Sequence, residues 1–159
     1  MNQFLDISPA RRLAFAKSEG GGPTVVFLGG LKSDMTGTKA MDLDAWARSR
    51  DLSFLRLDYS GHGQSSGRFE DGSIGDWADD ATEVIARTTT GPLVLVGSSM
   101  GGWIALLLAR AMPDAPPTIY VKSRVEILNA TSIAIARSRK VVPQGAANAA
   151  ALAEALSHV

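Results

Sequence analysis

The amino-acid sequence predicts an α/β protein with a mostly parallel sheet and helices on both faces. Three short apolar runs, Thr24–Leu28, Ser53–Leu57 and the one that begins at Pro92, are each followed by a loop and a helical pattern. Strands and helices that alternate in this way form a parallel sheet through right-handed crossovers. With 159 residues, the chain is sized for one domain with a real hydrophobic core.

The first elements are read from apolar runs and the turns between them. Leu13–Lys17 is predicted as an edge strand, closed by the glycine-rich turn Ser18–Pro23. Thr24–Leu28 is continuously apolar, which is typical of a strand covered on both faces. A loop over Gly29–Gly37 precedes a helix. We expect this helix to turn Ala40, Leu43, Trp46 and Ala47 inward and Asp42, Asp44 and Arg48 outward.

The second unit contains the strand Ser53–Leu57 and a long polar loop, Asp58–Gly72. Ser73 and Asp76 then have the spacing of a capping box, in which each residue bonds the backbone of the other at a helix start. The helix behind this box has one apolar stripe, formed by Ile74, Trp77, Ala78, Ala81, Val84 and Ile85.

The third unit, Pro92–Met112, carries the strongest chemical signal. A β-branched strand is followed by G-x-S-x-G at Gly97–Gly101 and then by an almost wholly apolar helix. This context is typical of a nucleophile elbow, where the turn is so sharp that the serine takes a strained backbone angle. The two glycines are needed because side chains there would collide with the neighbouring strand and helix. Ser99 is therefore the predicted nucleophile.

Composition excludes several classes of function. Sixteen basic and sixteen acidic residues give no net charge, which does not favour nucleic acid or an anionic membrane as partner. The absence of cysteine excludes disulfides, thiolate metal sites and a cysteine nucleophile. No signal peptide or membrane span is apparent, so we expect a soluble cytoplasmic protein.

Joined together, G-S-S-M-G-G-W, D-Y-S-G-H-G-Q-S-S-G and G-G-L-K-S-D-M-T-G-T-K-A resemble the α/β-hydrolase superfamily. Within it, the chain is most similar to the acyl-glucuronide esterase and palmitoyl-protein thioesterase group and its bacterial relatives. The resemblance covers about Leu13–Met112. It implies hydrolysis of a small acyl ester or thioester by a Ser-Asp-His triad, without metal or organic cofactor. It also implies that Ser99 is the nucleophile and that the backbone N–H groups of Leu31 and Met100 form the oxyanion hole.

The remainder of the chain departs from the group's pattern. After Pro113, Thr118–Leu128 offers one or two strands, Ile133–Ile135 is ambiguous, and Ala146–Leu156 reads as an alanine-rich helix. Neither an acid loop nor a late histidine segment is found. We therefore expect residues 1–112 to form an α/β-hydrolase N-terminal core, truncated after the elbow helix, and residues 113–159 to be an unmatched tail of the same domain.

Four residues are candidates for the missing acid and base. A helix over Met100–Met112 is roughly 20 Å long, which puts Asp114 at the opposite edge of the sheet. Glu126 is a weak candidate acid. His62 is expected to be a loop histidine bonded to backbone, and His158 has the right chain order but is next to the last residue. Trp46, Trp77 and Trp103 are expected in the core.

Two hypotheses stay open. The chain is either a serine esterase or thioesterase, or a catalytically incomplete fragment that binds a ligand or has no activity. The apolar residues Ile104, Leu106, Leu107 and Leu108 surround the elbow helix, while the tail offers little to cover them. Exposed leucines and an unpaired sheet edge favour association. We therefore also expect self-association.

Overall fold

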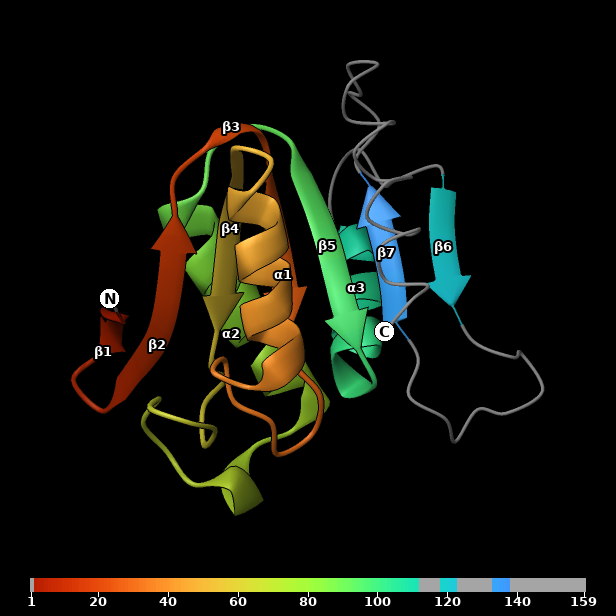
Figure 1. Ribbon diagram of the computed structural model, residues 1–159. Coiled ribbons are helices and arrows are strands. Elements are labelled where there is room, and N and C mark those ends of the chain that lie inside the picture. The colour runs from red at the N-terminus through yellow and green to blue at the C-terminus, as the bar shows by residue number, and fades with distance from the viewer. Residues whose placement is uncertain (1, 112–117, 123–132, 138–159) are drawn as a thin grey trace.

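The computed structural model describes residues 2–111, 118–122 and 133–137. These residues form a seven-stranded sheet with helices packed on it (Figure 1). In chain order the elements are β1 (Gln3–Ser8), β2 (Arg11–Ser18), β3 (Gly21–Leu28), α1 (Thr38–Arg48), β4 (Leu52–Leu57), the 3₁₀-helix η1 (Phe69–Asp71), α2 (Ile74–Thr88), β5 (Leu93–Ser98), α3 (Met100–Ala111), β6 (Thr118–Lys122) and β7 (Ile133–Arg137).

Parallel strands form the centre of the sheet. The order is β1-β2-β4-β3-β5-β7-β6, and β3 pairs in parallel with both β4 and β5. The flanking strands pair antiparallel, β2 with β4 and β7 with β5, and so do the outermost strands. The carboxyl ends of β3, β4 and β5 therefore meet at one edge, where the loops that follow them also lie (Figure 1).

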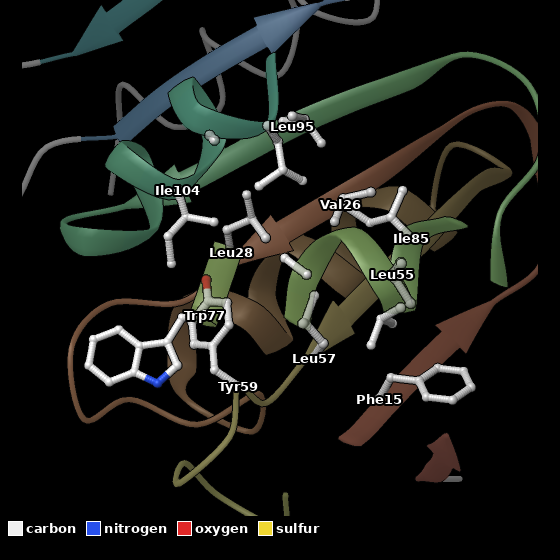
Figure 2. Packing of buried hydrophobic residues seen from close by; sticks show 14 of the residues in the cluster. Phe15, Val26, Leu28, Leu55, Leu57, Tyr59, Trp77, Ile85, Leu95 and Ile104 are labelled. Atoms are coloured by element: carbon white, nitrogen blue, oxygen red, sulfur yellow. The ribbon is translucent and has the colours of Figure 1, made fainter. Parts of the chain in front are cut away.

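Helices cover both faces of the sheet, as the sequence predicts. In Figure 1, α1 lies on the near face and α2 and α3 lie on the far face. The alternation of side chains along β3 separates the two cores: Val25 and Phe27 pack with α1, and Val26 and Leu28 pack with α2 and α3. Figure 2 shows the second core, in which Ile104 of α3 lies beside Leu28 and Leu95. The α/β class is thus confirmed.

Several expectations for single elements are confirmed. The capping box is present, since Ser73 Oγ accepts from Asp76 N and Asp76 accepts from Ser73 N at 2.9 Å. Strand β6 lies within Thr118–Leu128, which was read as one or two strands, and β7 begins at the ambiguous segment Ile133–Ile135 and continues to Arg137. The helix predicted over Ala146–Leu156 lies outside the described residues. The division of the chain after residue 112 stays a prediction.

Three expectations were wrong. The strand around Leu13–Lys17 is not at the edge, because β1 pairs with it on its outer side. Asp44 was expected to point outward, but it is only 5% exposed. Its carboxylate accepts hydrogen bonds from Ser18 Oγ at 3.0 Å and from Arg48 Nε at 2.8 Å. Trp103 is 58% exposed on the outer face of α3, although the apolar surroundings in the sequence indicated the core.

Among the described residues, no helix combines the length and apolar character that crossing a membrane requires.

Candidate active site

Ser99 occupies the turn between β5 and α3. Strand β5 ends at Ser98 and α3 begins at Met100, so a single residue reverses the chain. Ser99 has φ of 54°, in the left-handed region that non-glycine residues rarely adopt. Its side chain is exposed at the carboxyl edge of the sheet. Strain of this kind is common at functional sites, so it makes Ser99 a candidate functional residue.

Two glycines allow this turn to form. A Cβ at Gly97 would overlap the backbone of Gly101 and Gly102 in α3. A Cβ at Gly101 would overlap the Leu28 carbonyl of β3 and lie 2.6 Å from Gly29 O. The helix therefore packs backbone to backbone against the two central strands, and this close approach fixes the place of Ser99.

The loop after β3 lies against the same turn. A Cβ built on Gly30 would lie 3.5 Å from Ser99 Cβ and 3.3 Å from Ser98 O. Leu31 follows Gly30 directly and is 55% exposed. The structure therefore brings together the segments that carry the three predicted site residues, Ser99, Met100 and Leu31.

Asp58 ties this loop to the loop after β4. The residue is 2% exposed, and its carboxylate accepts from Met35 N at 2.7 Å and from Gln64 N at 2.9 Å. Gly63, with φ of 49°, approaches so closely that a Cβ would overlap this carboxylate. Burial raises the pKa of Asp58, while the two N–H donors act in the opposite direction. Asp58 thus holds two loops of the site at a fixed separation.

His62 lies inside the loop after β4 and away from solvent. It is 4% exposed, and its Nδ1 lies 3.2 Å from Ser60 O, as expected for a loop histidine bonded to backbone. The rings of Tyr59, Phe69 and Trp77 pack edge-on around it, with centroids 5.1 to 5.5 Å away. An imidazole enclosed in this way has no open path to a substrate. Its packing therefore accounts for the shape of the loop.

The other candidates for acid and base, Asp114, Glu126 and His158, lie outside the described residues. Within the described part of the chain, no group of three His, Cys, Asp or Glu side chains is arranged to hold a metal ion.

Sequence reasoning missed one polar pair beside Ser99. Lys39, in the first turn of α1, donates from Nζ to Ser98 Oγ at 3.3 Å. Ser98 is 6% exposed and Lys39 is half-buried. Nothing in the local pattern distinguishes this lysine from a surface residue, because its partner is 59 positions away.

The parallel centre of the sheet, the strained serine at its carboxyl edge and the glycines around it are the features of the α/β-hydrolase fold. The alpha/beta hydrolase family model matches residues 25–158, and the chain belongs to that family.

Individual relatives agree with this assignment. The chain is 39% identical over 111 residues to the human palmitoyl-protein thioesterase ABHD10, mitochondrial, covering 70% of this chain. It superposes on the structure of mouse alpha/beta hydrolase domain-containing protein 10 with a TM-score of 0.69 and 36% identity, over 72% of this chain and 46% of that one. The crystal structure of a protein from Agrobacterium vitis gives a TM-score of 0.66 and 30% identity, over 93% of this chain and 72% of that one. The chain spans about a third of the length of the curated relatives, 36% for the human protein.

Proposed function

We propose that this protein is a serine hydrolase that cleaves a carboxylic ester or thioester through an acyl-enzyme on Ser99. The observation that carries the proposal is the geometry of Ser99, exposed at φ of 54° between β5 and α3. The name of the human relative, a palmitoyl-protein thioesterase, supports a thioester or ester as substrate.

In the proposed reaction, Ser99 Oγ attacks the substrate carbonyl carbon. A bond forms between Ser99 Oγ and the carbonyl carbon, the substrate's C–O or C–S bond breaks, and the alcohol or thiol leaves with the proton of the serine. Water then adds its hydroxyl to the acyl carbon and returns a proton to Ser99 Oγ, which releases the acid. The backbone N–H of Met100 and that of Leu31 would meet the negative charge on the carbonyl oxygen. Removing one such donor costs a factor of about 10² to 10³ in rate.

The base is the unassigned part of this mechanism. His62 is enclosed by aromatic rings, and His158 is outside the described residues. Without a positioned imidazole, the serine hydroxyl keeps its proton at neutral pH. Acylation then depends on the oxyanion hole and substrate binding. In a triad enzyme that has lost one member, these two contributions still accelerate the reaction by a factor of about 10³ to 10⁴ over the rate in water.

The second candidate is a catalytically incomplete hydrolase that binds an acyl ligand without turnover. The specific observation in its favour is the enclosed His62, the one histidine among residues 2–111, 118–122 and 133–137. The predicted cytoplasmic location and self-association stay predictions, and the names of the palmitoyl-protein thioesterase relatives include the word mitochondrial.

A fluorophosphonate probe tests the nucleophile. We expect intact-protein mass spectrometry to show one adduct on the wild type, none on Ser99→Ala, and an adduct on Ser98→Ala. The Ser98 variant is the matched control, because it removes the adjacent hydroxyl and leaves Ser99 in place. Equal labelling of the wild type and Ser99→Ala would remove Ser99 from the mechanism.

A further inference from the structure

A cavity of about 240 Å³ opens beside Ser98, the residue before Ser99, on the α1 side of the sheet. Its walls include the end of β3, the loop at Gly29 and Gly30, the first turn of α1, and Ser98. Gly30 and Ser98 are also the residues that contact or adjoin Ser99. The cavity is therefore next to the proposed reacting centre.

One of the polar side chains that line this cavity carries a positive charge. Lys39 lines it, with Nζ held 3.3 Å from the buried Ser98 Oγ. Lys39 belongs to none of the ion pairs formed among the described residues. A half-buried ammonium that bonds one neutral hydroxyl retains donors for an anion. Gly37 at the N-cap has no side chain to bond the first-turn N–H groups, and no acidic residue lies in that turn, so the helix end adds a positive field.

One acidic side chain, Asp34, also lines the cavity. Its Oδ1 accepts from Thr36 N at 2.7 Å and from Thr36 Oγ1 at 2.5 Å. These hydrogen bonds lower the pKa of Asp34, so it is charged at neutral pH. The carboxylate is thus bound to its own turn on the exposed rim and not to Lys39. One cation with one acid nearby suits a single carboxylate better than a doubly charged phosphate.

The geometry points to a substrate class. We propose that the cavity binds the free carboxylate of a short dicarboxylic acyl group, with Lys39 as the specificity-determining residue for an ester or thioester cleaved at Ser99. This inference rests on the proposed function.

Size and reach agree with that class. At about 240 Å³ the cavity is small, which favours a short acyl group. Pockets for larger ligands are typically about 300 to 1,000 Å³. From standard bond lengths, Lys39 Nζ is at most roughly 12 Å from Ser99 Oγ. A chain of a few methylene groups fits between a carboxylate at Lys39 and a carbonyl at Ser99.

A binding measurement tests the site without turnover. Isothermal titration of the full chain would compare glutarate, butyrate and inorganic phosphate. We expect glutarate to bind at least about tenfold more tightly than butyrate or phosphate. Lys39→Met should remove this preference, and Lys39→Arg, which keeps the charge, should retain most of it. Glutarate binding that is equal in the wild type and Lys39→Met, with both variants melting like the wild type, would overturn the proposal. If Lys39→Met fails to fold, Lys39→Gln replaces it.

A labelling measurement separates this proposal from the proposed function. Glutarate should slow fluorophosphonate labelling of Ser99 in the wild type and not in Lys39→Met. Labelling of Ser99 with no protection by glutarate would contradict the carboxylate site and leave the nucleophile intact. Glutarate binding that depends on Lys39 in a chain that is never labelled would contradict the hydrolase and leave the site intact. Tighter binding of phosphate than of glutarate would also overturn the assignment to a carboxylate.

Discussion

The position of Ser99 depends on backbone contact between α3 and β3, and Gly101→Ala tests that dependence. The added Cβ would overlap Leu28 O and lie 2.6 Å from Gly29 O, where ordinary contacts begin near 3.4 Å. Helix α3 must therefore move away by about 1 Å. Overpacking of this kind costs about 1 to 3 kcal/mol, partly offset by up to about 1 kcal/mol from the helix propensity of alanine.

Gly75→Ala is the matched control. Gly75 is the second residue of α2, as Gly101 is of α3, and its Cβ would contact only Ser73 Oγ at 3.6 Å. Gly75→Ala should therefore gain about 0.4 to 1 kcal/mol. Because the propensity gain is common to both variants, they should differ by the overpacking cost of about 1 to 3 kcal/mol, or about 2 to 12 °C in Tm for a chain of this size.

Thermal melts and the rate of fluorophosphonate labelling would be measured together. We expect Gly101→Ala to lower both the Tm and the labelling rate at Ser99, and Gly75→Ala to lower neither. Equal melting temperatures with unchanged labelling would refute the reasoning that close helix packing positions the serine.

Three further predictions concern rate, pH and association. Hydrolysis of a p-nitrophenyl ester should be slow, with a rate like that of a triad enzyme that lacks its base. Turnover as fast as that of an ordinary esterase would show that a base is present. Hydrogen bonds from Ser73 lower the pKa of Asp76 below 3.8, so the stability they provide is present above that pH and is lost as the pH falls further. Ser73→Ala should therefore destabilise the protein at neutral pH and destabilise it less below pH 3.8. A loss of stability independent of pH in urea titrations would argue against the capping box. Trp103 and Leu106 of α3 are 58% and 41% exposed and should promote self-association. Changing both to Gln should shift the mass measured by light scattering towards that of the monomer. A wild type that is already monomeric would contradict this prediction.

The sequence predicted those features whose causes are local. The strand, turn and helix around Ser99 follow from glycine spacing and apolar runs, and the capping box follows from Ser73 and Asp76. The family resemblance also predicted that the loop containing Leu31 would approach the turn at Ser99. In the structure Gly30, the residue before Leu31, lies against Ser99.

Features that depend on distant partners could not be predicted from local patterns. The burial of Asp44 depends on hydrogen bonds from Ser18 of β2 and Arg56 of β4. Neither partner is apparent from the local pattern, which therefore predicted that this acidic side chain would face solvent. The exposure of Trp103 was missed for the converse reason, since an apolar pattern around a helix does not say which side the sheet leaves uncovered. The Lys39–Ser98 contact likewise joins two units of the fold.

The most direct test of the central claim is capture of the acyl-enzyme itself. The wild type and Ser99→Ala would be incubated with a p-nitrophenyl acyl ester, quenched in acid and analysed by intact mass and peptide mapping. Acid quenching preserves an ester adduct, and slow deacylation favours its accumulation. We predict one acyl group on the wild type, located at Ser99, and none at the corresponding peptide of Ser99→Ala. An adduct that maps to Ser98 or Lys39, or one that persists unchanged in Ser99→Ala, would contradict the assignment of Ser99 as the nucleophile.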